Sequence, residues 1–188
     1  PGPVLDFAGD GAPQWVTLDN WVEEFGDLEQ GTISAWIKIP GGDVVDTILA
    51  ASDPTDASSE VRFYYQFYQN EDGLRYDVRE NDADPIFQLS TAPVSPADDA
   101  WHHVAVTVGE GGDTTMYIDG AAAARGAQEG FFSAVTDLTV MSLGRNVDSS
   151  GSQWHLLGQM SDVAVWDAPL APAAVAALAA GTSPLGEP

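Results

Sequence analysis

The chain has 188 residues, of which 44% are hydrophobic, and this is enough for one globular domain with a substantial core. Its 29 acidic side chains outnumber its 6 basic ones, and the net charge of −23 argues against nucleic acid or anionic membranes as partners, because both would repel it. The chain has no cysteine, which excludes disulfides, a thiol nucleophile and cysteine-ligated metals, and it has no apolar run long enough to insert into a membrane.

Residues of alternating polarity recur along the chain, and a two-residue period is typical of β-strands that bury one face. In chain order, the segments with this pattern are Gly31–Pro40, Glu60–Gln69, Leu74–Val78, Val104–Val108, Thr115–Ile118, Leu138–Gly144 and Leu156–Asp167. Two Asp-Gly pairs, Asp72-Gly73 and Asp119-Gly120, are typical of hairpin turns. Many short strands without helices between them predict an all-β fold, an antiparallel sandwich or jelly roll.

One segment near the end of the chain departs from this pattern. Leu170–Gly181 is rich in alanine, carries Pro172 at the position of a first helical residue and ends at a glycine, so we expect a short C-terminal helix. The domain is therefore expected to span residues 1–181, and Thr182–Pro188 reads as a linker. Because the chain begins Pro1-Gly2-Pro3 without a methionine, we interpret it as one module of a longer protein with flanking domains.

Four motifs follow one another in an order that is known from a protein family. They are Trp101–Thr107 (WHHVAVT), Met116–Gly120 (MYIDG), Leu143–Arg145 (LGR) and Leu157–Asp167 (LGQMSDVAVWD). This set resembles the laminin-G-like and pentraxin-like domains, which are concanavalin A-like jelly rolls, and the resemblance extends from about residue 4 to residue 180. It implies two facing antiparallel sheets and a short helix. It does not imply a particular ligand, because this fold carries many functions.

The excess of carboxylates needs counter-ions, since like charges destabilise a compact chain. High salt or an exterior rich in divalent cations supplies them, so the composition indicates an extracellular or cell-surface protein in a saline environment. Most of the aspartates are expected to form a solvated surface. A few are candidates for binding Ca²⁺, a hard cation that takes six to eight oxygen ligands.

The resemblance implies one calcium site after the Leu143-Gly144 strand end. Pentraxin-like domains carry calcium ligands there, and they take partner acids from an earlier loop that corresponds here to Asp53–Glu60. The candidate ligands are Asp53, Asp56, Asn146, Val147 and Asp148, with Val147 offering its carbonyl oxygen. Arg145 and Asn146 depart from the family pattern and lower the negative charge of the site, so an ordinary turn is the alternative.

A second cation site would join the two ends of the chain. Asp6 or Asp10 could meet Asp162 on the last strand, because the terminal strands of such sandwiches often lie side by side. Laminin-G-like relatives carry a structural cation on or near their sheets, so the resemblance implies that an ion here would hold the termini together. The alternative is that Asp162 accepts backbone hydrogen bonds at the start of a strand.

Sugar binding needs aromatic rings that stack on pyranose faces, next to polar side chains that bond hydroxyl groups. Trp154 lies in a turn-like stretch, where a large apolar group is costly to expose unless a ligand covers it. The candidate ligand-binding residues are Trp154, Tyr64, Tyr68, Arg62 and Gln66, of which the last four share one face of a predicted strand. The alternative for this strand is that both of its faces are buried.

Catalytic motifs are weak in this sequence. The jelly-roll glucanases carry E-x-D-x-x-E on a strand, and the nearest stretch here, Glu80–Pro85, lacks the final acid. The chain has no G-x-S-x-G nucleophile motif and no phosphate-binding loop, although its many serines and aspartates leave a Ser-His-Asp triad open. We therefore expect a non-catalytic module.

Together these features predict an extracellular recognition module that binds carbohydrate with the help of calcium. The rival hypothesis is a structural or adhesion module that contacts other proteins and has no sugar site. Exposure of Trp154, Tyr64 and Tyr68 in one groove would favour the first hypothesis, and their separate burial would favour the second.

Overall fold

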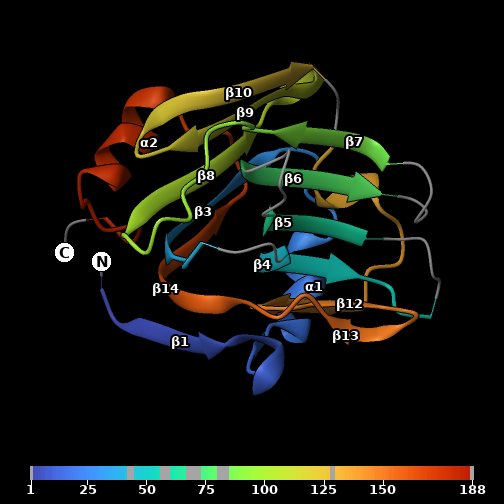
Figure 1. The fold of residues 1–188 in the computed structure, drawn as a ribbon. Coiled ribbons are helices and arrows are strands. Elements are labelled where there is room, and N and C mark those ends of the chain that lie inside the picture. The colour runs from blue at the N-terminus through green and yellow to red at the C-terminus, as the bar shows by residue number, and fades with distance from the viewer. Residues whose placement is uncertain are drawn as a thin grey trace.

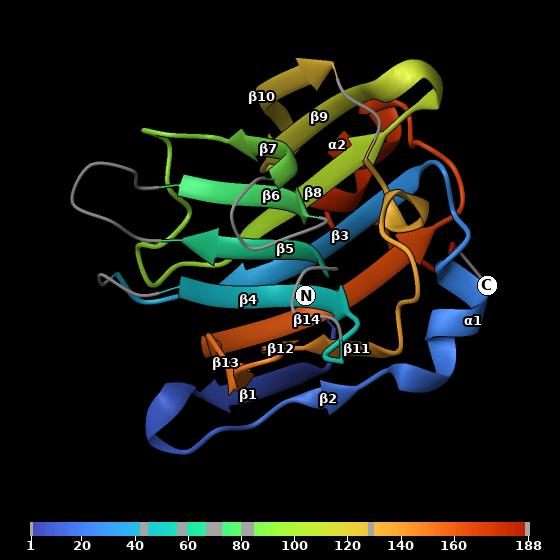
Figure 2. The same cartoon turned by 90° about the vertical axis from the view of Figure 1, so that its right-hand side faces the viewer.

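The computed structural model describes residues 2–41, 45–55, 60–66, 73–79, 85–127 and 130–186, and of residues 60–66 only the backbone. Two six-stranded antiparallel sheets face each other (Figures 1 and 2). In spatial order, sheet A consists of β1 (Val4–Ala8), β14 (Leu157–Trp166), β3 (Gly31–Lys38), β8 (His102–Val108), β9 (Asp113–Ile118) and β10 (Ala121–Ala127). Sheet B consists of β2 (Val16–Thr17), β11 (Val140–Leu143), β4 (Val45–Ser52), β5 (Glu60–Gln66), β6 (Gly73–Arg79) and β7 (Pro85–Ser90). The predicted all-β sandwich is confirmed.

Short elements connect the strands and fill the ends of the sandwich. A two-stranded ribbon of β12 (Asn146–Asp148) and β13 (Gly151–Gln153) lies next to β4. The helical turns are η1 (Gly9–Gly11), η2 (Asp19–Trp21), α1 (Val22–Phe25), η3 (Glu110–Gly112) and η4 (Phe132–Ala134). Within the described residues, no helix is long and apolar enough to cross a membrane.

The alternation that predicts the strands also builds the core. Ile33, Ala35 and Ile37 of β3 point between the sheets and are fully buried, and each buried isoleucine contributes about 1.5–3 kcal/mol to folding. Tyr76 of β6 is also fully buried. Its hydroxyl donates a hydrogen bond to the Gly130 carbonyl, so the polar end of this large ring is satisfied inside the core.

The two ends of the chain lie side by side, as the sequence predicts. β1 pairs with β14 along its whole length, and β14 in turn pairs with β3. The Gly2 N–H donates to the Asp162 carboxylate at 2.7 Å, and the Ser161 hydroxyl donates to the Pro3 carbonyl at 3.0 Å. These bonds fasten the N-terminus to the last strand of the sandwich.

The predicted C-terminal helix is confirmed as α2 (Pro172–Ala179), with Pro172 in its first turn. Figure 1 shows α2 beside β8, β9 and β10, and the helix packs against β8 and β10. Val175 is fully buried there in a cluster with Ala105 and Tyr117. The helix therefore covers part of the outer face of sheet A.

Candidate functional site

Charged residues of both signs gather on the outer face of sheet B. Along β6, every second residue from Leu74 to Val78 is fully buried in the core, so Arg75, Asp77 and Arg79 lie on the opposite face of the strand. The strand register places Arg62 of β5 opposite Asp77. Three of the six basic residues of the chain therefore share one face of one sheet with two acids, Asp77 and Glu60, the latter opposite Arg79.

Two rows of this face continue across the neighbouring strands in register. One row contains Ala50 of β4, Arg62 of β5, Asp77 of β6 and Gln88 of β7. The adjacent row contains Thr47 of β4, Tyr64 of β5, Arg75 of β6 and Ser90 of β7. The register thus aligns polar and charged residue types of four strands, of which Thr47, Ala50 and Asp77 are buried.

A buried carboxylate organises the centre of this surface. Asp77 is completely inaccessible to solvent. It accepts hydrogen bonds from Arg79 Nε at 3.0 Å and from Gln88 Nε2 at 3.1 Å. Breaking either hydrogen bond would leave the buried carboxylate less compensated, which is costly. The Arg79 and Gln88 side chains are therefore held in defined positions by Asp77.

The residues predicted to bind sugar map onto the same face, as far as the structure describes them. Arg62, Tyr64 and Gln66 occupy alternate positions of β5, although of this strand only the backbone is described, and Tyr68 lies outside the described residues. The half-buried Trp154 accepts a hydrogen bond at its carbonyl from Thr47 N–H at 3.2 Å, in the row that contains Tyr64. The backbone of Trp154 therefore lies at the edge of this face.

A hydrogen bond joins the strand end that precedes the Asp53 loop to the segment that carries Asn146 and Asp148. The Ser52 hydroxyl at the end of β4 donates to the Val147 carbonyl of β12. Buried Asp148 accepts bonds from Ser150 N–H at 2.7 Å and from the Gln153 amide. Asp53 accepts hydrogen bonds from the Thr55 N–H at 2.9 Å and from the Thr55 hydroxyl at 2.7 Å. Asn146 is fully buried. Asp56 lies outside the described residues. A calcium ion shared by these two loops remains a prediction.

The three acids expected to join the chain ends each have a different partner. Asp6 accepts a bond from the Gln159 amide, and Asp10 bonds His155 Nδ1 at 2.7 Å. Asp162 accepts the Gly2 N–H, a backbone hydrogen bond as in the alternative for this residue, although Asp162 lies inside β14 and not at the start of a strand. In the part of the chain that the structure describes, no three histidine or acidic side chains converge as metal ligands.

One buried acid was not singled out from the sequence. Asp46 at the start of β4 has an exposed fraction of 1%, and its Oδ1 accepts the Leu157 N–H at 2.6 Å. Its Oδ2 has no hydrogen-bond partner among the described residues. Burial, together with the smaller effect of the Asp10 charge, outweighs the hydrogen bond from Leu157 and raises the pKa of Asp46 from 3.8 to about 7. In the sequence, the only sign of this buried acid is that Asp46 stands shortly before the apolar residues 48–51.

A Ser-His-Asp chain lies next to this acid. The Ser152 hydroxyl is 2.8 Å from His155 Nε2, and His155 Nδ1 is 2.7 Å from Asp10 Oδ1. Ser152 and Asp10, the two outer members of this Ser-His-Asp network, are exposed, and the Asp10 side chain is 79% accessible. A catalytic triad relies on a buried carboxylate to orient its histidine, so we interpret this chain as a link between η1 and the β12–β13 ribbon.

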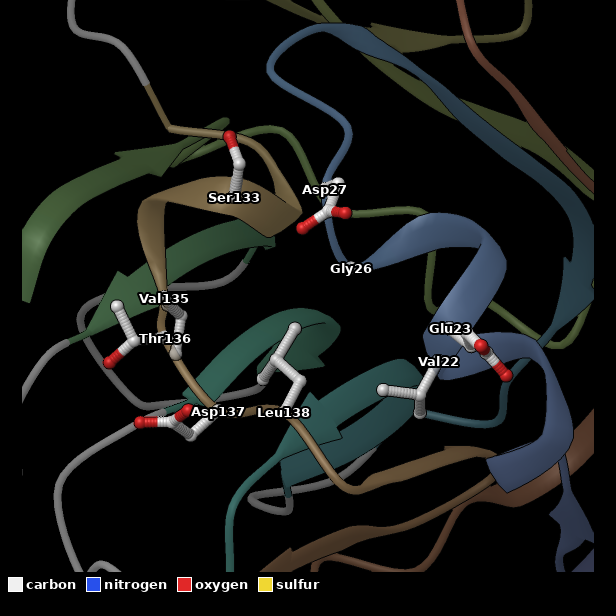
Figure 3. A pocket seen from close by; sticks show the side chains of 9 residues that line it. All are labelled: Val22, Glu23, Gly26, Asp27, Ser133, Val135, Thr136, Asp137 and Leu138. Atoms are coloured by element: carbon white, nitrogen blue, oxygen red, sulfur yellow. The ribbon is translucent and has the colours of Figure 1, made fainter.

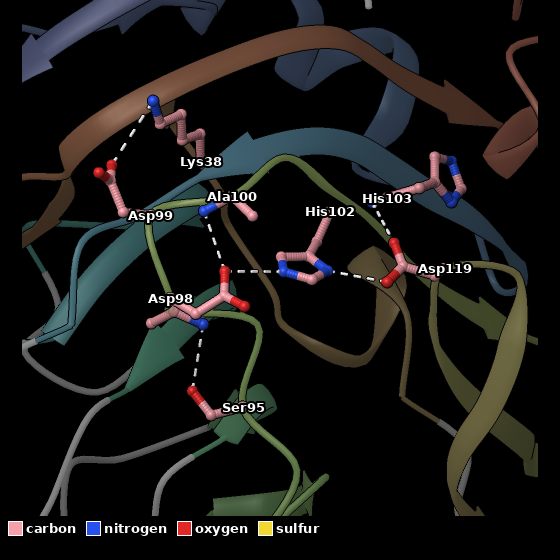
Figure 4. A network of polar contacts seen from close by, with 9 residues as sticks. Lys38, Ser95, Asp98, Asp99, Ala100, His102, His103 and Asp119 are labelled. Atoms are coloured by element: carbon pink, nitrogen blue, oxygen red, sulfur yellow. Dashed lines mark hydrogen bonds and ion pairs between the residues drawn. The ribbon is translucent and has the colours of Figure 1, made fainter.

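A second polar network ties a loop to a hairpin of sheet A (Figure 4). His102 Nδ1 is 2.8 Å from the Asp119 carboxylate, and His102 Nε2 is 3.0 Å from the Asp98 carboxylate. The other Asp119 oxygen accepts the His103 N–H at 3.0 Å. Burial alone would lower the pKa of His102, but the hydrogen bonds that its ring donates to the Asp119 and Asp98 carboxylates outweigh burial and raise the pKa.

This network predicts a pH-dependent contribution to stability. Because the pKa of His102 is raised, its stabilising effect is present in full below pH 6.5 and is lost as the pH rises through the folded-state pKa. Compared with His102→Gln, the parent protein should gain more unfolding free energy at about pH 5.5 than at about pH 8. Urea unfolding at both pH values measures this, and an equal difference at the two would contradict the assignment.

A hollow elsewhere in the molecule has acidic residues at its rim. A cavity of about 420 Å³ lies between α1 and the segment after η4 (Figure 3). Val22, Val135 and Leu138 line it with methyl groups, while the carboxylates of Asp27 and Asp137 lie at its rim. Carboxylates at the opening disfavour an anionic ligand, so this cavity and the outer face of sheet B select for different chemistry.

The arginines of β6 were also missed as site residues, although the signal for them is local. The stretch Leu74–Arg79 reads L-R-Y-D-V-R, so alternation places its three charged side chains on one face. What the alternation does not reveal is the pairing of β5 with β6, which adds Arg62 to that face.

Comparison with known proteins agrees with the fold. A family model described as the concanavalin A-like lectin/glucanases superfamily, of the laminin-G type, matches residues 10–176. The chain therefore belongs to this superfamily as a laminin-G-like domain, and the predicted resemblance is confirmed. A search of curated protein sequences gives no significant match.

Solved structures show the same fold at low sequence identity. The CBM40 domain of the Ruminococcus gnavus IT-sialidase, bound to α2,3 sialyllactose, has a TM-score of 0.76 at 16% identity, with 94% of this chain and 98% of that chain covered. The leech intramolecular trans-sialidase has a TM-score of 0.78 at 16% identity, with 96% of this chain and 27% of that chain covered. A pentraxin from Limulus polyphemus has a TM-score of 0.61 at 17% identity, with 94% and 80% covered.

Proposed function

We propose that this chain is a non-catalytic recognition module that binds carbohydrate on the outer face of sheet B, and that the bound sugar carries an anionic group. The observation that supports this most is the placement of Arg62, Arg75 and Arg79 on one face of a chain whose net charge is −23. An anionic sugar is repelled by most of this surface and attracted where the arginines gather.

The chemistry of this face suits such a ligand. Arginine binds carboxylates in a planar, bidentate geometry, and these charge-assisted bonds are about twice as strong as neutral ones. Gln88 and Ser90 of β7 supply amide and hydroxyl groups of the kind that bond sugar hydroxyls. Trp154, whose backbone borders the row of Tyr64, is our candidate for stacking on a pyranose ring.

The structural neighbours support the same class of ligand. Two structures of the Ruminococcus gnavus CBM40 domain contain α2,3 and α2,6 sialyllactose, which are glycans with a carboxylate. At 16–17% identity these domains support the general class of ligand, and they do not identify the sugar bound by this chain. We therefore propose an anionic glycan rather than a named one.

We further propose that the protein acts in an extracellular or cell-surface setting and that calcium orders the loops near the sugar. The acidic composition and the Ser52–Val147 bond, which joins the residues directly before Asp53 and Asp148, support this part of the proposal. Measuring glycan affinity in the presence of calcium and in the presence of a chelator tests this part of the proposal. Equal affinity under the two conditions would show that calcium has no role in glycan binding.

Arg75→Gln is expected to weaken binding of sialyllactose by about 10- to 100-fold, because a charge-assisted hydrogen bond contributes about 1.5–3 kcal/mol. Isothermal titration calorimetry measures this, with lactose as the uncharged comparison. Arg125→Gln on β10 makes the same chemical change on sheet A and should bind like the parent protein. Equal affinity for lactose and sialyllactose would contradict the anionic-sugar proposal, and absence of binding to any glycan would favour an adhesion module.

A further inference from the structure

The guanidinium group of Arg145 is a half-buried cation that lacks an acidic partner. Its Nε is buried and has no hydrogen-bond partner among the described residues. In the same part of the chain no carboxylate lies within ion-pair distance of Arg145, although the sequence contains 29 acids. Native structures rarely leave a buried N–H group without an acceptor, because its removal from water is costly.

The electrostatic surroundings of Arg145 leave its charge only partly compensated. Burial lowers the pKa of Arg145, and this effect outweighs the charge of Asp19, which raises the pKa. The Asp19 carboxylate is itself engaged, since its Oδ1 accepts the Met141 N–H at 3.0 Å. An anion that binds beside Arg145 supplies the compensation that the protein does not.

An accessible aromatic ring holds this guanidinium group in a defined position. Arg145 Cζ lies 4.1 Å from the centroid of the Trp15 ring, which is the geometry of a cation–π contact. Trp15 is 42% exposed, so a large apolar ring and a planar cation lie together at the surface. A guanidinium group that is already held in place loses less conformational freedom when it binds a ligand.

Strand pairing assembles this pair of side chains at the edge of sheet B. Val16 of β2 pairs with Leu143 of β11, so the residues before β2 and after β11 come together. β2 is the outermost strand of the sheet, and β11 and β4 separate it from β5 and β6 (Figure 2). The Arg145–Trp15 pair therefore lies apart from the arginines of β5 and β6.

Nearby acids limit the charge of a ligand that this pair can bind. Asp10 bonds His155 Nδ1 at 2.7 Å, and the His155 ring lies 6.2 Å from the Trp15 ring. Together with Asp19, this carboxylate repels a ligand that carries several negative charges. A ligand with one carboxylate is compatible with both acids.

We propose that Arg145 and Trp15 form a second binding site, which takes a single carboxylate attached to a sugar ring. The guanidinium group pairs with the carboxylate in a charge-assisted contact, and the indole ring packs against the apolar face of the pyranose. The inference rests on the proposed function for the class of ligand, but not for the location of the site. Two such sites on one module allow it to bind two sugars of a glycan.

The test is an NMR titration of the ¹⁵N-labelled chain with sialyllactose. The Arg145 Nε–H and Trp15 indole N–H signals should shift with sialyllactose, which carries one carboxylate, and should not shift with lactose. Sodium acetate, a carboxylate without a sugar ring, should shift them only at a concentration about 10 times higher or more. This titration of the unsubstituted chain does not require any variant to fold.

Matched variants separate this site from the outer face of sheet B. Arg145→Gln should weaken the binding that the Trp15 signal reports by about 10-fold or more, and Arg125→Gln on β10 should leave it unchanged. Arg75→Gln, which weakens sugar binding on sheet B, should also leave the Arg145 and Trp15 shifts unchanged. The proposal is overturned if sialyllactose moves neither signal, if lactose or acetate moves them equally at the same concentration, or if Arg75→Gln abolishes the shifts. Sialyllactose binding that Arg75→Gln abolishes, with the Arg145 and Trp15 signals unmoved, would refute this site and leave the proposed function intact.

Discussion

In the presence of a chelator, Asp46→Asn is expected to be more stable than the parent protein above neutral pH and nearly equal to it at about pH 4. The pKa of Asp46 is raised from 3.8 to about 7 because burial disfavours its charged form. Because the folded-state pKa of Asp46 is raised, the parent protein keeps its full unfolding free energy below pH 3.8. It loses part of that free energy as the pH rises through 7 and the buried carboxyl group has to ionise. The asparagine keeps an oxygen that accepts the Leu157 N–H and carries no charge.

The expected size of this effect follows from the difference between the ordinary and the raised pKa of Asp46. The range from 3.8 to about 7 corresponds to about 4 kcal/mol of unfolding free energy at alkaline pH. Urea unfolding at about pH 4 and about pH 8 measures the gain. Asp46→Ala removes the acceptor for Leu157 as well and should be less stable than Asp46→Asn at both pH values. A gain that is the same at both pH values would show that the charge of Asp46 is not its cause.

The second large effect is expected at the glycine that ends β11. Gly144 has φ +79°, its N–H donates to Ile48 O at 3.2 Å, and its carbonyl accepts Leu156 N–H at 2.9 Å. A Cβ at this position would overlap the ring of buried Phe7. Gly144→Ala should therefore lose about 2–5 kcal/mol, partly from the left-handed backbone and partly from forcing the Phe7 ring out of place.

Gly111→Ala separates these two causes. Gly111 has φ +77°, nearly the same backbone conformation, but an added Cβ there would meet no atom within 4 Å. It should lose only the conformational part, about 1–2 kcal/mol. The difference between the two variants in urea unfolding then measures the steric conflict with Phe7. Equal losses would show that the Phe7 ring moves aside without cost.

Comparison of β10 and α2 shows where local sequence predicts structure and where it does not. Both segments are rich in alanine, the residue with the highest helix propensity. The second begins at Pro172 and forms the predicted helix. Residues Ala121–Ala127 instead form a strand, because the turn at Asp119-Gly120, with φ +51° and +77°, folds the chain back onto β9 and cross-strand pairing follows. Tertiary pairing outweighs a weak local preference.

The candidate site divides in a similar way. The positions of Arg62, Tyr64 and Gln66 on one strand face follow from alternation alone, and the structure agrees with that register. β4 was not detected from alternation because nearly all of its residues are buried, on both faces. Asp46 lies in that strand, so the burial that changes its pKa was not visible in the sequence.

The sequence by itself determined the strands of alternating polarity, the C-terminal helix, the excess of acidic residues and the membership of the laminin-G-like family, but it did not reveal β4 or β10. Two-residue alternation, a proline at a helix start and ordered motifs act over short stretches of chain. Only the tertiary structure decided which charges lose water and which gather. The Leu157 N–H that binds Asp46 is 111 residues away, and the arginines of β5 and β6 share a face through strand pairing. Desolvation depends on contacts between distant segments, and the register of β5 with β6 is fixed by their pairing, of which the sequence indicated only the turn signal at Asp72-Gly73.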